Sequence, residues 1–294
     1  MIMFGCANNI NRYNYVCYLE IAMKVALLIM AAGRSSRFGG TPKMLCRVGS
    51  NEESLFEISL QQMRRSLDIC HIHLVVNVDN KAQIMEEVHL VNFKHNICDK
   101  ITYNIQEIGA GRSKPWGTAD AVASAAPYME TQFLLVNSDD LYGYQTFDMI
   151  SKQCVSTGNY IIGFTLGSTL QENKSANRGF ITLRVDGNVS ALQENVNIDK
   201  TMFSEYELNN QYVSVNLLLL QPSILAYLIR DVDTFKSENT HNRTVESLLP
   251  NFLNALISNG ELHMEMIKSA DSWMGVTYND DVTEIRRAIC DMNA

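Results

Sequence analysis

The stretch that decides the fold is KVALLIMAAGRSSRFGGTPKML, residues 24–45. Its apolar run predicts a buried strand over 25–30, and a loop rich in glycine and serine follows. Three cations lie in this loop: Arg34, Arg37 and Lys43. Backbone N–H groups in such a turn can crowd around an anion, and the cations supply the opposite charge. The stretch therefore predicts a phosphate site, although on its own it also fits a glycine-rich turn with incidental surface cations.

The composition of the 294 residues excludes some classes of function. With 46% hydrophobic residues, the chain can bury a full core. The net charge of -8 argues against a protein that binds nucleic acid or an anionic membrane surface, because such binding depends on lysine and arginine. No apolar run approaches the ~20 residues that span a bilayer. The seven cysteines are scattered without a C-x-x-C pair, which favours a reduced, cytoplasmic protein.

Residues 1–22 differ in character from the rest of the chain. They lack the basic start and the apolar centre of a signal peptide. Because Met23 directly precedes the first predicted strand, we expect the native start there and expect 1–22 to be a poorly ordered extension. Residues 23–294 contain no evident linker or internal repeat, so we expect them to form a single domain.

Apolar strands alternate with helices along the first half of the chain, which is typical of a parallel sheet covered on both faces. In the second half, a hairpin is predicted around Asp186-Gly187-Asn188, one long strand over 212–220, and a helix over 243–258. We therefore predict an α/β fold, a Rossmann-like three-layer α/β/α arrangement around a mixed, mostly parallel sheet.

Two further segments point to bound ligands. WGTA at 116–119 places a glycine and small side chains at a predicted helix start, with Thr118 as the N-cap. Either a flat base approaches the backbone there, or the segment is a plain helix cap. Asp139-Asp140 ends a short predicted strand, and ligand sites in open α/β sheets lie off such ends. Carboxylates there suit Mg²⁺ that also binds substrate phosphates, or they serve as turn residues.

A third constellation flanks the predicted hairpin. Arg178-Gly179 precedes it and Glu194 follows it. A second substrate could meet these polar groups.

Together these segments resemble a known family. AAGRSSRFGGTPKML resembles the signature loop of the sugar nucleotidyltransferases, WGTADAV their base-binding segment, and LLVNSDDLYG their metal-binding strand end. Residues 273–281 resemble a W-x-G-V-T-Y-x-x-D segment of bacterial NTP-transferase proteins. The resemblance implies the nucleotide-diphospho-sugar transferase (GT-A-like) fold from about residue 24 onward.

The resemblance also implies an activity and a site. The activity is transfer of a nucleoside monophosphate from an NTP to a sugar 1-phosphate, or a similar small phosphate, with Mg²⁺ as cofactor and pyrophosphate as product. By role, the implied residues are Arg37 and Lys43 for catalysis; Ala32, Gly33, Gln106, Gly117 and Thr118 for the nucleotide; Arg178, Glu194 and Asn216 for the sugar phosphate; and Asp139 for the metal.

Three positions depart from the family pattern. Ser35 replaces the second glycine of the usual loop, which narrows the room for backbone approach. Asn195 follows Glu194 where the family has a lysine, so the usual cation for the sugar phosphate is missing. Its candidate replacements are Lys174, Arg178 and Lys200. Gly275 stands where the family has a second metal aspartate; either Asp271 replaces it, or one carboxylate and the phosphates hold Mg²⁺.

Two other functions fit these residues. A GT-A glycosyltransferase that consumes a nucleotide sugar needs the acidic metal motif but leaves Arg37 and Lys43 unexplained. A catalytically inactive nucleotide-sugar-binding protein would explain Asn195 and Gly275. The base, the acceptor and the oligomeric state stay open, and we expect neither a nucleic acid nor a membrane as partner.

His71 and His73 lie two apart on a predicted strand and so share one face, which suggests a zinc site. No cysteine or carboxylate stands at ligand spacing beside them, so we interpret the pair as part of an ordinary strand face.

Overall fold

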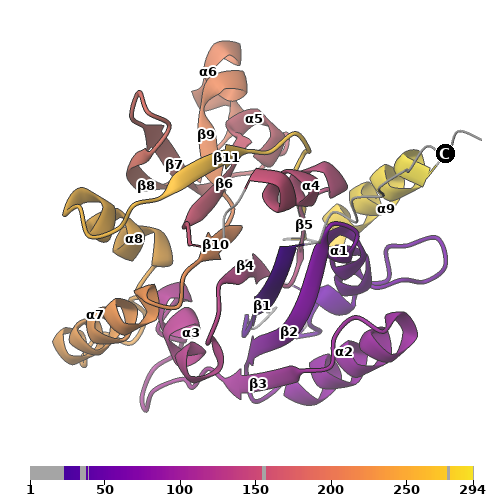
Figure 1. Ribbon diagram of the computed structural model, residues 1–294, viewed down its shortest axis with the longest axis horizontal. Helices are drawn as coiled ribbons and strands as arrows, with labels where there is room; N and C mark the ends of the chain where they lie inside the picture. The colour runs from indigo at the N-terminus through magenta and orange to yellow at the C-terminus, as the bar shows by residue number, and fades with distance from the viewer. Residues whose placement is uncertain (1–22, 34–37, 39, 154–156, 277–278, 294) are drawn as a thin grey trace, which may run out of the picture.

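We describe the protein from a computed structural model (Figure 1). It describes residues 23–33, 38, 40–153, 157–276 and 279–293. The predicted extension over 1–22 and the loop cations Arg34 and Arg37 lie outside the described residues.

A ten-stranded mixed sheet forms the centre of the molecule, in the order β3-β2-β1-β4-β10-β6-β9-β7-β8, with β11 added beside β6. Its strands are β1 Met23–Ala31, β2 Leu67–Val76, β3 Ile101–Ile105, β4 Phe133–Asn137, β6 Tyr160–Thr165, β7 Ala176–Leu183, β8 Val189–Ile198, β9 Tyr212–Ser214, β10 Leu218–Leu220 and β11 Glu265–Lys268. The strands β1 to β4 are parallel, and Ile29 of β1 stands between Leu74 and Val136. The strands β7 to β10 pair antiparallel with their neighbours. The predicted mixed sheet with mostly parallel core strands is confirmed.

Helices cover both faces of this sheet and complete the three layers (Figure 1). They are α1 Leu55–Arg64, α2 Lys81–His95, α3 Thr118–Ser124, α4 Tyr144–Gln153, α5 Leu166–Thr169, α6 Glu205–Asn210, α7 Ile224–Glu238, α8 Leu249–Ser258 and α9 Asn279–Asn293. One core packs side chains of α3, α7 and α8 against the sheet, and a second packs those of α1, α2 and α4. None of the helices in the described ranges is long and apolar enough to cross a membrane.

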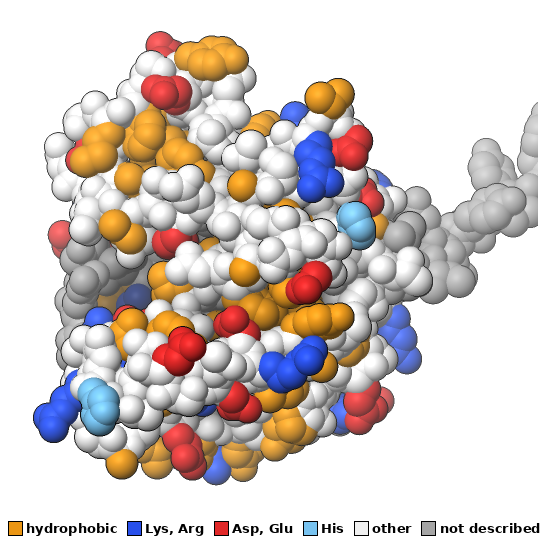
Figure 2. Space-filling view, turned by 90° about the vertical axis from the view of Figure 1, so that its left-hand side faces the viewer, with side chains coloured by type: hydrophobic (Ala, Val, Ile, Leu, Met, Phe, Trp, Pro, Cys, Tyr) orange, Lys and Arg blue, Asp and Glu red, His pale blue; other side chains and the backbone are white. Residues whose placement is uncertain are grey.

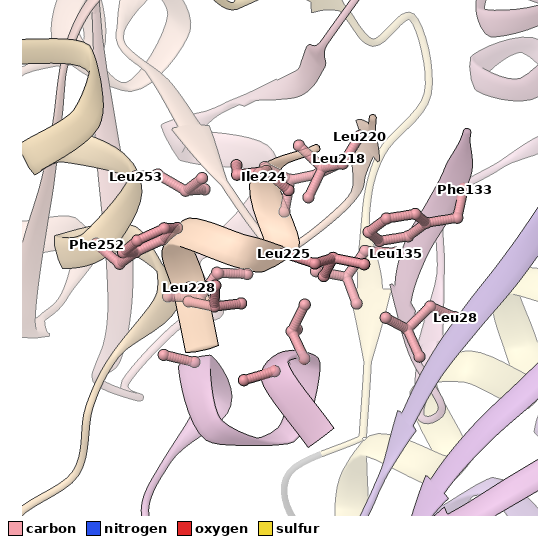
Figure 3. Packing of buried hydrophobic residues seen from close by; sticks show 14 of the residues in the cluster. Leu28, Phe133, Leu135, Leu218, Leu220, Ile224, Leu225, Leu228, Phe252 and Leu253 are labelled. Carbon is pink, nitrogen blue, oxygen red and sulfur yellow. The ribbon is translucent and has the colours of Figure 1, made fainter. Parts of the chain in front are cut away.

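The apolar run of β1 serves both cores, because successive side chains of a strand point to opposite faces. Leu28 belongs to the core under α3, α7 and α8, whereas Leu27 and Ile29 belong to the other. Figure 3 shows Leu28 in the first core together with Phe133 from β4 and Leu225 from α7. Burial on both faces explains why this strand reads as continuously apolar rather than alternating.

The outer face that carries α7 and α8 bears both acidic and basic side chains (Figure 2). The charges of the two signs are interspersed among the side chains visible there. The described side chains visible on this face form no concentrated basic patch.

The structure corrects the prediction of one strand over 212–220. Strand β9 ends at Ser214 and β10 begins only at Leu218. Asn216, between them, has a φ of 64°, in the left-handed region that asparagine tolerates better than most residues. The break interrupts the strand between two buried residues, Val215 and Leu217.

The predicted helix over 243–258 begins only at Leu249, as α8. The preceding residues run along the start of α3 instead, where the Ser247 N–H donates to Trp116 O (2.6 Å) and the Ala119 N–H donates to Ser247 O (3.1 Å). Thr118 is not the N-cap of α3, which is Gly117. The Thr118 hydroxyl instead accepts from the Leu249 N–H (2.9 Å). Backbone groups expected within one helix thus pair with a distant segment.

Two short strands outside the main sheet also position the site. β5 (Asp140–Leu141) pairs antiparallel with β12 (Met274–Gly275), so that Gly275 lies opposite Asp140. The late Trp-x-Gly segment is thereby held beside the end of β4.

Candidate active site

A cleft of about 270 Å³ lies at the carboxyl end of β4 and beside the β7–β8 hairpin. Six residues predicted for the site line it: Lys43, Thr118, Asp139, Arg178, Glu194 and Asn216. These residues come from segments spread over most of the chain, so the fold brings together what the sequence scatters.

Lys43 and Asp139 meet directly in this cleft. The Lys43 Nζ donates to Asp139 Oδ2 at 3.0 Å, and the two side chains are 22% and 27% exposed. Lys43 opens a short 3-10 turn that ends at Leu45 and whose Met44 is buried, so packing holds the lysine at the cleft. An accessible ammonium beside an accessible carboxylate can neutralise a phosphate with one group and hold a divalent cation with the other.

The end of β1 is held by two buried asparagines that sequence reasoning missed. The Asn77 Nδ2 donates to Ala32 O (3.1 Å) and to Gly33 O (3.3 Å), and the Asn80 Nδ2 donates to Ala31 O (3.0 Å). Ala32 and Gly33 are thus fixed where the loop starts, but they are not among the described residues that line the cleft. In the structure both asparagines follow the end of β2 at Val76, whereas the sequence pattern suggests a strand that runs through Asn77 to Val78.

Gln106 and Gly117 form the support of α3 rather than part of the cleft lining. Gln106 is 5% exposed, and its Nε2 donates to Gly117 O (2.9 Å) and to Asp120 Oδ2 (2.8 Å). Gly117 has a φ of 105°, and a Cβ there would lie 2.3 Å from Ser247 O. The space beside this glycine, which the sequence suggested for a base, is therefore filled by the Ser247 backbone.

A loop before α3 is clamped to the same distant segment by Arg112. Its guanidinium donates to Asn242 O (2.6 Å) and Val245 O (2.5 Å) and stacks 3.5 Å from the Trp116 ring centre. The clamp holds the Trp116-Gly117 turn in place.

Asp140 follows the half-buried Asp139 and is itself buried. It is 4% exposed, and its Oδ2 accepts from Asn137 Nδ2 (2.7 Å) and from the Tyr142 hydroxyl (3.3 Å). Burial, and then the charge of Asp139, raise the pKa of Asp140 from 3.8 to about 7. Both carboxylates line the cleft, and Asp139 is the more accessible of the two.

Asp271 does not lie in the cleft. Its Oδ2 accepts from the Thr146 N–H (2.8 Å) and the Thr146 hydroxyl (3.2 Å) in the first turn of α4. It also lies against Gly143, where a Cβ would be 2.3 Å from its Oδ2. The structure thus gives Asp271 a helix-capping position instead of the predicted one beside Asp139. Chain proximity to Trp273 misled the sequence argument.

The opposite wall of the cleft carries Arg178 and Glu194, on neighbouring strands. Arg178 donates to Thr169 O (2.6 Å) and Asn177 O (2.8 Å), and its guanidinium stacks 4.6 Å from the Trp273 ring centre. Its Nε is buried without a hydrogen-bond partner among the described residues. Burial lowers the pKa of Arg178 and raises that of Glu194, while their mutual attraction opposes both shifts.

The structure separates the three candidate cations for the acceptor phosphate. Of these three, Arg178 alone is among the described residues that line the cleft. Lys174 pairs with the buried Asp281 at 2.5 Å, and Lys200 pairs with the exposed Glu172 at 2.8 Å.

A family model described as nucleotidyl transferase matches residues 26–291, nearly the whole described chain. The chain belongs to the nucleotidyl transferase family. Among curated proteins, none matches it.

Solved structures with this fold include other members of the nucleotidyl transferase group. The inositol-1-phosphate CTP transferase from T. maritima superposes with a TM-score of 0.63 at 13% identity, over 91% of this chain and 96% of the other. A putative glucose-1-phosphate thymidylyltransferase from Bacillus anthracis gives 0.62 at 12%, over 92% and 97%. The CTP:phosphocholine cytidylyltransferase from Streptococcus pneumoniae gives 0.60 at 12%, over 91% and 99%. The TM-scores establish a shared fold, and at 12–13% identity the likeness shows the fold alone.

The carboxylates of this nucleotidyl transferase could hold Mg²⁺ only if substrate phosphates supply further ligands. Among the described residues, no group of three His, Cys, Asp or Glu side chains could hold a metal ion. Asp139 offers one accessible carboxylate, and Mg²⁺ commonly takes one or two carboxylates together with phosphates and water.

His71 and His73 belong to a buried network, as expected of a strand face. Both contact the Thr102 hydroxyl, at 2.6 and 2.7 Å, and His73 also contacts Asn104 Oδ1 at 2.8 Å and stacks on Tyr128. Burial lowers the pKa of His73 to about 4, so the ring is neutral at physiological pH.

Proposed function

We propose that this nucleotidyl transferase moves an NMP group from an NTP to a sugar 1-phosphate or a similar small phosphate, releasing pyrophosphate. The observation that carries the proposal is the contact between the Lys43 ammonium and the Asp139 carboxylate, in one cleft with Arg178 and Glu194. The proteins of the same fold act on an inositol phosphate, a glucose phosphate and phosphocholine, which supports a small phosphate as acceptor.

The reaction needs no general base. The second pKa of a phosphate monoester is ~6, so the acceptor is largely a dianion near neutral pH. An acceptor oxygen attacks the α-phosphorus, a new P–O bond forms, and the bond to the β-phosphate oxygen breaks to release pyrophosphate. The protein supplies alignment and charge neutralisation.

Each wall has its own task in this proposal. Lys43 neutralises the triphosphate, together with Arg37, which lies outside the described residues. Asp139 holds Mg²⁺, which when bound neutralises charge on the phosphates. Arg178 binds the acceptor phosphate, and Glu194 and Asn216 contact the rest of the acceptor. Because the cysteines described as free include Cys46, Cys70 and Cys98, we place the reaction in a reducing compartment, the cytoplasm.

The test is pyrophosphate release by the purified protein with each of the four NTPs and a panel of sugar and other small phosphates. We expect release with at least one pair, dependent on Mg²⁺ and abolished by EDTA. No release with any pair, despite nucleotide binding, would favour an inactive nucleotide-sugar-binding protein. Consumption of a nucleotide sugar without pyrophosphate would favour a glycosyltransferase.

A further inference from the structure

Asn137, the last residue of β4, lines the cleft together with Asp139. Its Nδ2 donates to Asp140 Oδ2 at 2.7 Å and to Val215 O at 3.2 Å. A backbone carbonyl can only accept a hydrogen bond, so the contact with Val215 fixes which end of the amide is the nitrogen. The Asn137 side chain is therefore held in one orientation, with its Oδ1 turned away from these two acceptors.

The Oδ1 of Asn137 is an oxygen that the protein leaves open. No described residue donates a hydrogen bond to it. It is also absent from the buried polar atoms that lack a partner among the described side chains. Because Asn137 lines the cleft, an oxygen that is neither paired nor buried is accessible from the cleft. Its lone pairs are available to a ligand.

An open oxygen beside Asp139 suits a hard cation. Mg²⁺ takes oxygen ligands, commonly one or two from the protein together with phosphates and water. The Lys43 ammonium contacts Asp139 at Oδ2, so the Oδ1 of that carboxylate has no partner among the described residues either. Two protein oxygens at the end of β4 are thus unpaired.

Asp140 has a different task at this strand end. It is 4% exposed, and its Oδ2 already accepts from the Asn137 amide and from the Tyr142 hydroxyl. Ligands of a metal are commonly oriented by such hydrogen bonds from a second layer of groups. We therefore interpret Asp140 as the group that orients Asn137.

Resting on the proposed function, we propose that Asn137 is the second protein ligand of Mg²⁺, through its Oδ1, beside the Asp139 carboxylate. Substrate phosphates and water supply the other ligands. The same amide donates to Val215 O, next to Asn216 on the acceptor side of the cleft. One side chain thus connects the cation to the wall that receives the acceptor.

The Mg²⁺ effect, defined as the ratio of NTP affinity with Mg²⁺ to NTP affinity with EDTA, tests this assignment. Calorimetry of the full chain without acceptor measures it, using the NTP that binds most tightly. Asn137→Ala removes the oxygen, so we expect the Mg²⁺ effect to fall by about tenfold. Asn137→Asp keeps an oxygen but loses the Nδ2 donor, so we expect at least the wild-type effect. A purely structural role depends on Nδ2 and predicts an aspartate no better than alanine.

Asn177 offers matched control substitutions on the opposite wall of the cleft. Its Oδ1 already accepts from the Asn197 N–H at 3.0 Å. We expect Asn177→Ala to keep the wild-type Mg²⁺ effect, and Asn177→Asp to show what an added charge alone does. Three results would each overturn the inference: an unchanged effect in Asn137→Ala, Asn137→Asp no better than Asn137→Ala, or Asn137→Asp no better than Asn177→Asp.

A measurement on the wild-type chain makes the test independent of how the variants fold. Mn²⁺ replaces Mg²⁺ in the NTP complex, and the chain carries ¹³C at the side-chain carbonyl of its asparagines. We expect electron–nuclear double resonance to show the ¹³C coupling of an amide bonded to the ion through its oxygen. The absence of this coupling would overturn the inference.

Failure of the inference and failure of the proposed function give different results. Pyrophosphate release by the wild type, with an unchanged Mg²⁺ effect in Asn137→Ala, would support the function and overturn the inference. A Mg²⁺ effect that depends on Asn137, with no pyrophosphate release for any pair of substrates, would do the reverse.

Discussion

The wall of the cleft that carries Lys43 and Asp139 comes from the loop after β1 and the end of β4, which are neighbouring parallel strands. The wall that carries Arg178 and Glu194 comes from an antiparallel hairpin and needs Trp273 from near the C-terminus to support it. Parallel strand ends converge at one sheet edge, so local motifs suffice to build the first wall. The second wall depends on contacts between distant segments.

The first wall should dominate turnover. In Lys43→Ala we expect the rate of pyrophosphate release to fall by about 10²–10³-fold, because one preorganised charge on the reacting phosphates is lost. The melting temperature should stay nearly unchanged, since a partly exposed ion pair adds little stability. Lys114→Ala, which removes a surface ion pair with Glu246, is the matched control and should keep wild-type turnover. A Lys43→Ala enzyme with the wild-type rate would remove the lysine from the site.

The sheet behind the first wall should be sensitive to acid, because His73 is buried in β2, next to β1. Its pKa of about 4 in the fold lies below its ordinary value of 6.5. Between pH 6.5 and pH 4, His73 is therefore protonated in the unfolded chain and still neutral in the folded chain. The free energy of unfolding is therefore unaffected by His73 above pH 6.5. It falls by about 3 kcal/mol as the pH is lowered from 6.5 to 4.

Urea denaturation from pH 7 to pH 4 measures this effect. Wild-type protein should lose more stability over that range than His73→Gln, whereas the exposed His89→Gln control should follow wild type. Equal slopes for wild type and His73→Gln would show that the ring titrates normally in the fold.

Two glycines predicted for the nucleotide site should respond differently to alanine. At Gly117 a Cβ would lie 2.3 Å from the Ser247 carbonyl, and the φ of 105° is strained for any side chain. Gly117→Ala should therefore lower the free energy of unfolding by about 1–3 kcal/mol. At Gly33 a Cβ meets no atom of the described residues within 4 Å, so Gly33→Ala should change stability little. Chemical denaturation decides, and equal losses at both positions would contradict the packing described for Gly117.

The smallest expected effect comes from a substitution in the second wall, at Arg178. Arg178→Lys keeps the charge but loses the planar guanidinium that stacks on Trp273 and donates to two carbonyls. We expect the KM for the acceptor phosphate to rise by about tenfold while the KM for the NTP is unchanged. Steady-state kinetics with each substrate varied in turn measures both, and a rise confined to the NTP would place Arg178 on the wrong side of the cleft.

The same contrast explains what could be predicted from the sequence. The layered α/β fold was predictable because strand and helix periods are local properties, and β1 is apolar enough to signal burial on both faces. The meeting of Lys43 with Asp139 followed from strand ends at one sheet edge.

Predictions failed where tertiary contacts override local pattern. Residues 243–248 have no helix because their backbone pairs with the start of α3. Asp271 caps α4 although it is close to Trp273 in the chain. Each of these outcomes is decided by residues more than ten positions away, which no local motif records.

The central claim is that Lys43 and Asp139 jointly hold a triphosphate and its Mg²⁺. The most direct measurement is NTP affinity, by calorimetry, with Mg²⁺ and with EDTA, in wild type and in Asp139→Asn. We expect Mg²⁺ to tighten NTP binding by about tenfold or more in wild type and by much less in Asp139→Asn. The same Mg²⁺ effect in both proteins would contradict the claim.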